Sequence, residues 1–296
     1  MIVYPVSGRY SSDFDGFNKL SKLFMELGPL EFELIQLDFK NCTWFEANLC
    51  AVLGGIINQI QNNLNRVQLV NLPPQIERIF SKNHFLSYFG ESPVSDFYKT
   101  TIKYRRYKPA EEILFKKYLD EELLSKEDMP EMSVTIEQKI NESIFEIFVN
   151  ACTHGETENI FSCGQYFPNK QPDPRIDFTI VDLGKTIRKN VSDFLKKEVT
   201  SKQALMWATS KRNTTKTGSV PGGLGLKLIQ EFLKLNNGEM QIVSDDGFWQ
   251  LSKNSATFTK LMTNRFPGTI VNLEININDK NYYYDSEEEL DERDIF

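Results

Sequence analysis

The sequence predicts an α/β protein of the α+β kind, in which a small α/β layer precedes a larger sheet backed by helices. In residues 1–90, strand-like stretches such as "FELIQLDF" alternate with helix-like ones such as "GFNKLSKLFMELG", which is typical of a small α/β layer. In the second half, the apolar stretches "PRIDFTIVDLG" and "GTIVNLEIN" are strand-like, and the glycine cluster "PGGLGL" opens a helix. Both observations favour sheets covered by amphipathic helices.

The elements follow this order along the chain. Residues 1–92 run from the strand "MIVYPV" to a short helix after Gln75, and residues 93–130 form a connector with the strand "DFYKTTIKYRRYK" and a helix opened by Pro109. Residues 131–278 begin with a long helix that Ser133 or Thr135 caps. Further on, the residues Asp245–Gly247 fit a hairpin turn.

Residues 279–296 form an acidic tail. They hold eight acidic and two basic residues, whereas the whole chain has a net charge of −7. We expect this tail to be solvated, because a charge block of this kind rarely packs. The rest of the chain is nearly neutral, so the basic, tyrosine-rich strand of the connector gives little support for a nucleic-acid partner.

The composition is that of a folded, non-membrane protein. The 296 residues, 40% hydrophobic and 12% aromatic, suffice for two domains of common size. No run of apolar residues is long enough for a membrane span, and "MIVYPVSGRY" lacks the layout of a signal peptide. We therefore expect a cytoplasmic protein that does not contact a membrane.

Four cysteines argue against both zinc and a disulfide framework. Cys42, Cys50, Cys152 and Cys163 lie among apolar neighbours and form no C-x-x-C pair. We expect them to be reduced thiols inside the fold.

A polar stripe runs along the long helix of the second half. Glu142, Glu146, Asn150 and His154 are four residues apart, so they project from one face of a helix that otherwise offers Ile144 and its apolar neighbours for burial. Taken singly, such residues more often face solvent, and His154 alone would more often cap a helix C-terminus. The stripe indicates a binding site only together with two later segments, the strand end "IVDLGKTI" and the cluster "GGLGL".

In this order, the three pieces resemble the Bergerat-fold ATPases of the GHKL superfamily, over roughly residues 133 to 277. "EIFVNACTHG" is most similar to the first motif of anti-sigma-factor serine kinases and of histidine-kinase-like ATPase domains. The resemblance implies an α/β sandwich with a mixed sheet backed by helices, and it implies ATP and Mg²⁺ as cofactors.

The residue types also suit this chemistry. Asn150 offers a neutral amide oxygen to a Mg²⁺ ion that takes its other ligands from water and phosphates. Glu146, one turn earlier, could orient and deprotonate the water or hydroxyl that attacks the γ-phosphate, with Glu142 as the alternative base. The resemblance adds His154 to the nucleotide contacts.

The other site residues come from the resemblance. It places the adenine-reading carboxylate at Asp182, with Gly184 allowing close approach of the base, and Thr186 stands where the family has a second glycine. Thr269 is an adenine-side contact on the last strand. The residues that complete the predicted nucleotide site lie beside the first box, in the second glycine box and in a lid over residues 187–221: Lys185, Lys211, Arg212, Lys216, Gly222, Gly223, Leu224, Gly225 and Leu226.

Residues 30–90 resemble the STAS domain of anti-anti-sigma factors. The positions that match the family's phosphorylatable turn read Glu46-Ala47-Asn48-Leu49, so no hydroxyl is available and the resemblance implies a docking or scaffold module instead. Asn48 could contact a partner or cap a helix.

Three functions follow from these resemblances. The chain would hydrolyse ATP, or transfer the γ-phosphate to a serine or threonine of a partner protein. The alternative is a non-catalytic, ATP-gated interaction switch, for example in a stress-response, toxin–antitoxin or phage-defence system. A partner protein docking through the STAS-like part is expected, and a homodimer is left open.

Overall fold

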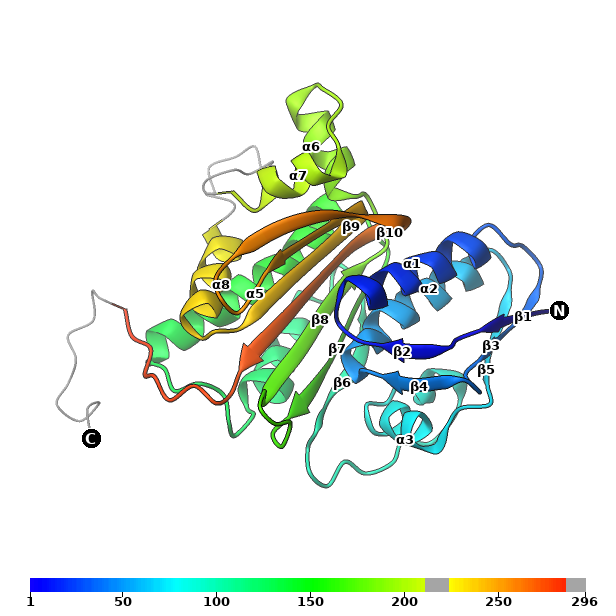
Figure 1. Ribbon diagram of the computed structural model, residues 1–296, viewed down its shortest axis with the longest axis horizontal. Helices are drawn as coiled ribbons and strands as arrows, with labels where there is room; N and C mark the ends of the chain where they lie inside the picture. Colours follow the sequence, from blue (N-terminus) through cyan, green and yellow to red (C-terminus); the bar gives the residue numbers. More distant parts are fainter. Residues whose placement is uncertain (211–223, 286–296) are drawn as a thin grey trace.

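The fold is α+β, and its centre is an antiparallel five-stranded sheet (Figure 1). This computed structural model describes residues 1–210 and 224–285. The strand order is β6 (Thr101–Tyr107), β7 (Ile160–Phe167), β8 (Arg175–Asp182), β10 (Thr257–Asn276) and β9 (Glu239–Leu251). Each neighbouring pair is antiparallel, so the mixed sheet that the resemblance implies is not what forms here.

Helices α4 (Glu112–Tyr118), α5 (Val134–His154) and α8 (Leu224–Leu235) share one hydrophobic core with one face of this sheet. The Ser133 side chain accepts a hydrogen bond from the backbone N–H of Ile136, which makes Ser133 the N-cap of α5. Ile140, Ile144 and Phe148 of α5 are buried in that core. The polar stripe of α5 therefore lies beside its packed face.

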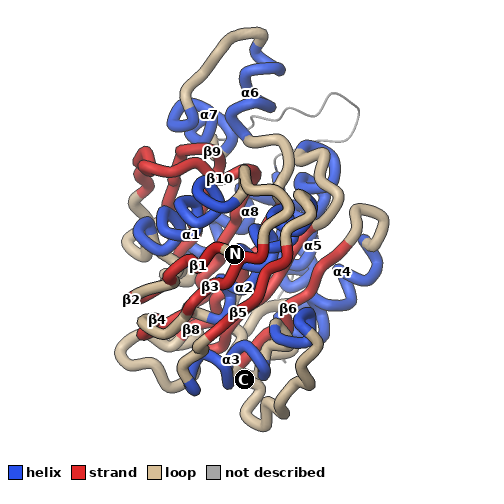
Figure 2. Tube along the Cα trace, turned by 90° about the vertical axis from the view of Figure 1, so that its right-hand side faces the viewer, coloured by secondary structure: helices blue, strands red, loops and turns tan. Residues whose placement is uncertain are grey.

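The other face is covered by the N-terminal layer, residues 1–90. Its helices α1 (Phe14–Leu27) and α2 (Cys50–Asn62) pack on the five-stranded sheet. A parallel sheet of β1 (Ile2–Pro5), β3 (Leu34–Asp38) and β5 (Arg66–Val70) lies farther out, in front in Figure 2. The remaining elements of this layer are β2 (Gly8–Tyr10), β4 (Cys42–Phe45) and α3 (Pro74–Lys82).

The N-terminal layer and the sheet share one hydrophobic core. Phe17 and Ile56 of the layer belong to the same buried cluster as Phe161, Val181 and Ile270 of the sheet. Polar side chains also join the two parts, because the buried Asn48 amide donates to Thr179 Oγ1 and to Asn272 Oδ1, both at 3.0 Å. The turn that resembles the STAS phosphorylation site is thus covered by the chain's own sheet.

The predicted hairpin turn at Asp245–Gly247 is wrong. Strand β9 continues through these residues to Leu251, and the turn falls after it, where the Ser252 N–H donates to the Ala256 carbonyl. Asp245 has a positive φ of 55°. Its carboxylate binds Arg188 and Ser201, so these residues form an irregular point inside the strand.

The first residues of the acidic tail do pack. Tyr283 is 9% exposed, its ring contacts Phe232, and its carbonyl accepts from the N–H of Ser133 at 2.8 Å. The expectation of a tail solvated from Asp279 onward therefore fails up to Asp285, which pairs with Lys139.

The division into residues 1–92, 93–130 and 131–278 stays a prediction. The connector strand β6 is an edge strand of the central sheet, paired with β7. Within the described part of the chain, no helix has both the length and the apolar character needed to span a membrane.

Candidate functional site

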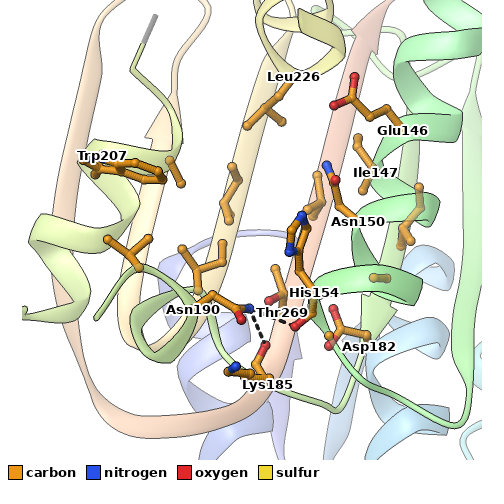
Figure 3. Close-up of a pocket in the computed structure, with 18 residues that line it drawn as sticks. Glu146, Ile147, Asn150, His154, Asp182, Lys185, Asn190, Trp207, Leu226 and Thr269 are labelled. Carbon is orange, nitrogen blue, oxygen red and sulfur yellow. Dashed lines mark hydrogen bonds between the residues drawn. The ribbon is translucent and has the colours of Figure 1, made fainter. Parts of the chain in front are cut away.

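A cavity opens at one end of the central sheet, between α5 and the helices α6 (Ile187–Leu195) and α7 (Ser201–Ala208) (Figure 3). The space between these elements is about 960 Å³ when the open solvent at its mouth is included, and the cavity itself is about 150 Å³. Its apolar floor comes from sheet residues Ile180, Ile242 and Val271. These alternate with the residues that face the N-terminal layer.

The polar stripe of α5 forms one wall. Glu146, Asn150 and His154 line the cavity, one helical turn apart, as Figure 3 shows, whereas Glu142 is exposed and does not line it. The Asn150 side chain makes no hydrogen bond within residues 1–210 and 224–285. An amide on a cavity wall without a protein partner is suited to bind a ligand.

Glu146 contacts the start of α8. Its Oε2 accepts a hydrogen bond from the Gly225 N–H at 2.8 Å, and a Cβ at Gly225 would lie 2.3 Å from the same oxygen. A side chain at position 225 would therefore displace the Glu146 carboxylate from this contact. The predicted base and the predicted second glycine box are therefore neighbours, and the carboxylate also satisfies a backbone donor of the first turn of α8.

Asp182 ends strand β8 at the floor of the cavity. The residue is 4% exposed, and its Oδ1 accepts from the Gly184 N–H at 3.0 Å. Burial raises the pKa of this carboxyl to about 7, although backbone hydrogen bonds from Gly184 and Thr269 oppose the shift. A carboxyl at this pKa can accept a hydrogen bond from a ligand amine near neutral pH.

The loop after Asp182 is tightly packed against the end of α5. A Cβ at Gly184 would lie 1.9 Å from the Gly155 carbonyl oxygen, so no other residue fits there. That same carbonyl accepts from the Lys185 N–H. The loop's position, and with it that of Asp182, is therefore fixed by backbone contacts.

Two predicted loop residues have structural partners. Thr186 has an extended backbone with a φ of −70°, and its hydroxyl caps α6 by accepting from the Lys189 N–H. The departure from glycine therefore causes no backbone strain. The stem of Lys185 lines the cavity, but its ammonium group pairs with Asp193 at 3.0 Å and with Glu156 at 3.4 Å.

Leu226 and Thr269 line the cavity as well. The Thr269 and Ser244 hydroxyls are 3.3 Å apart. Lys211, Arg212, Lys216, Gly222 and Gly223 lie outside the described residues, and Leu224 begins helix α8. The structure thus brings Glu146, Asn150, His154, Asp182, Lys185, Leu226 and Thr269 to one cavity.

Among the lining residues that were not predicted singly are Asn190 of α6 and Trp207 of α7. The Asn190 amide donates to the His154 carbonyl at 2.9 Å and reaches the Lys185 carbonyl at 3.5 Å, as Figure 3 shows. Trp207 forms the wall opposite α5. A signal existed in the capping box of Thr200 and Gln203, which marks a helix within the segment that we predicted as a lid.

The comparisons with known proteins do not show which family this chain belongs to. No known family profile and no curated protein matches the chain. Among solved structures, it is similar to the histidine kinase domain from Erythrobacter litoralis EL346 blue-light activated histidine kinase. That match has 12% sequence identity and a TM-score of 0.25, and it covers 89% of this chain and 95% of that chain. The class of the fold, α+β, follows from the strands and helices themselves.

Proposed function

We propose that this chain is an ATP-binding regulatory protein of the Bergerat, GHKL type. The buried carboxyl of Asp182 on the cavity floor is the observation that supports this most. It would accept a hydrogen bond from the exocyclic amine of adenine, while the polar stripe of α5 lies on the wall above it. The phosphates would then extend along α5 toward the start of α8, where backbone N–H groups favour anions.

The Asn150 amide fits a Mg²⁺ ion that arrives with the nucleotide. Magnesium in phosphate sites keeps several waters and needs few protein ligands. When bound, it would neutralise charge on the β- and γ-phosphate oxygens. Asn150 would hold the ion through its amide oxygen, which has no protein partner in the described chain.

Glu146 would act as the proton acceptor if the phosphate is transferred. The oxygen of a water, or of a partner's serine or threonine, forms a bond to the γ-phosphorus while the bond to the β–γ bridging oxygen breaks. The proton of the nucleophile goes to Glu146, and ADP leaves. The chain is then an ATPase or a protein serine/threonine kinase.

A second candidate is an ATP-gated switch without turnover. The hydrogen bond from Gly225 to Glu146 favours it, because that carboxylate already satisfies the start of α8. Closing of α8 on a bound nucleotide could then be the output itself. In either case we propose that a partner protein contacts the N-terminal layer on a surface other than Glu46–Leu49, since Glu46, Asn48 and Leu49 are buried.

One experiment separates these candidates. Purified protein is incubated with γ-labelled ATP and Mg²⁺, and free phosphate, labelled protein and intact ATP are then separated. Free phosphate indicates an ATPase, label on an added partner indicates a kinase, and intact bound ATP indicates the switch. Absence of ATP and ADP binding by calorimetry would overturn the proposal.

A further inference from the structure

Leu183 connects the site loop to the N-terminal layer. It stands between Asp182, on the cavity floor, and Gly184, which packs on the end of α5. The Leu183 side chain, however, packs into the hydrophobic core that the N-terminal layer shares with the sheet. Successive residues at a strand end point to opposite faces, so one residue faces the nucleotide site and the next faces α2.

Helix α2 contacts Leu183 at Gly55, which has no side chain. A Cβ at Gly55 would lie 2.4 Å from Leu183 Cδ1 and 3.2 Å from Phe161 Cδ2. The leucine therefore fills the space that any larger residue at position 55 would need. The position of Leu183 depends on how closely α2 approaches the sheet.

A second contact joins α2 to the neighbouring loop. The Asn159 amide donates to Asn58 Oδ1, one turn after Gly55, at 3.3 Å. Asn159 belongs to the loop that leaves α5, and Thr157 in the same loop lies 3.2 Å from where a Cβ at Gly184 would be. Both loops that fix Asp182 thus touch the same helix of the N-terminal layer.

We propose that the N-terminal layer sets the geometry of the nucleotide site through α2, with Leu183 and Asn159 as positioning residues for Asp182. This inference rests on the proposed function, because it assumes that Asp182 reads the base. Coupling between two parts of a protein is reciprocal. A partner that shifts α2 therefore changes nucleotide affinity, and a bound nucleotide changes the affinity for that partner.

Two adjacent glycines of α2 provide a matched test. A Cβ at Gly54 would lie 2.2 Å from the Tyr104 hydroxyl oxygen, so Gly54→Ala crowds β6, whereas Gly55→Ala crowds Leu183. We expect both substitutions to lower thermal stability. Only Gly55→Ala should weaken ADP binding, about fivefold to tenfold, and reduce the preference for ADP over inosine diphosphate, which lacks the exocyclic amine.

Base preference is the decisive measurement, because general destabilisation does not alter it. Two results would overturn this inference without affecting the proposed function. One is an unchanged ratio of the Kd values for ADP and inosine diphosphate in folded Gly55→Ala, and the other is an equal loss of ADP affinity in both glycine variants. Wild-type protein that binds no ADP overturns the proposed function and this inference with it.

Leu183→Ala provides the test if Gly55→Ala does not fold. It removes the positioning side chain and leaves α2 intact. We expect the same reduction in the preference for ADP over inosine diphosphate. Leu69→Ala is its control, because Leu69 packs on the same core from β5. A folded Leu183→Ala variant with wild-type base preference contradicts the proposed role.

Discussion

Asp182 is buried and lines the cavity floor. Under the proposed function, the protonation state of its carboxyl should decide whether adenine or hypoxanthine binds more tightly. The pKa of this carboxyl is raised to about 7 by burial. Below that pH the neutral carboxyl can donate a hydrogen bond, and above it the carboxylate only accepts. Adenine offers an amine at the position where hypoxanthine offers a carbonyl oxygen.

We predict that the preference for ADP over inosine diphosphate increases with pH. The ionised carboxylate accepts from the adenine amine, and the protonated carboxyl donates to the hypoxanthine oxygen, so the ratio of the two Kd values should change by roughly tenfold between pH 5.5 and pH 8. Titration of the phosphates cancels in this ratio. Calorimetry at several pH values measures it, and Asp182→Asn is the control, for which the ratio should stay constant. A constant ratio in the wild type would contradict the assignment of Asp182.

Substitutions at Glu146 can distinguish a role in ATP binding from a role in ATP turnover. Glu146→Gln keeps an oxygen that can accept from the Gly225 N–H but removes the proton acceptor. ATP should therefore still bind, while any turnover falls by roughly 10²–10⁴-fold. Glu146→Ala also removes the acceptor for α8, so it should weaken ATP binding in addition.

Rates of ATP hydrolysis and Kd values for the two variants test this prediction. Glu142→Ala is the control, since that residue is exposed and outside the cavity. Full turnover in Glu146→Gln with ATP bound would show that Glu146 is not the base.

The residues of α5 could be predicted because helical spacing alone places them on one face. Asn190 and Trp207 could not be predicted singly, because their roles depend on where α6 and α7 pack against the site. The interaction of Asn190 with the His154 carbonyl spans 36 residues of chain. Local patterns do not report a contact of that kind.

Helix α5 depends on an element that the sequence suggested was solvated. Ser133 caps the helix with its side chain, while its own N–H donates to the Tyr283 carbonyl, and the Tyr283 N–H donates to Glu131. The charges of the tail predicted solvation, but Tyr283 is buried, whereas Tyr282 and Tyr284 are exposed. A count of charges over the tail does not reveal a single buried side chain such as Tyr283.

We predict a division in stability between chains that end at residue 278 and at residue 285. The chain that ends at residue 278 should lose roughly 2–4 kcal/mol in its free energy of unfolding relative to the one that ends at residue 285. The loss comes from the buried Tyr283 ring on Phe232 and two backbone hydrogen bonds at the start of α5. Urea denaturation measures the difference, and Tyr283→Ala should reproduce most of it. Equal stability of the two truncated chains would contradict this division.

Strand β9 shows how a turn signal can be overridden. Asp-Asp-Gly is a turn sequence, yet Arg188 and Ser201 bind the carboxylate of Asp245, and Leu205 occupies the space beside Gly247. These contacts hold α6 and α7 against the sheet. The contacts with α6 and α7 therefore outweigh the local preference of Asp245–Gly247 for a turn.

In the whole molecule, the N-terminal layer and the central sheet are joined by buried charge as well as by apolar contact. Arg175 at the start of β8 is 8% exposed, and it contacts Glu46 of the layer at 3.3 Å, together with Asp177 at 2.8 Å and Glu274 at 3.0 Å. Burial raises the pKa of Asp177 well above its usual range, and the neighbouring Glu274 adds to the shift. The alternation of strands and helices predicted this layer, but no sequence pattern shows that it covers the second sheet.

We therefore predict that residues 93–296 do not fold alone. Without the layer, the apolar face that includes Phe161, Val181 and Ile270 becomes exposed to water. The buried guanidinium of Arg175 keeps Asp177 and Glu274 but loses Glu46, one of its carboxylate partners. The separated fragment should keep helical far-ultraviolet circular dichroism but lack cooperative thermal unfolding. Adding residues 1–92 as a second chain should restore cooperativity, because the contacts across this boundary are non-covalent. Cooperative unfolding of the fragment by itself would show instead that the layer is an independent domain, and a scaffold that can detach would then become the better description.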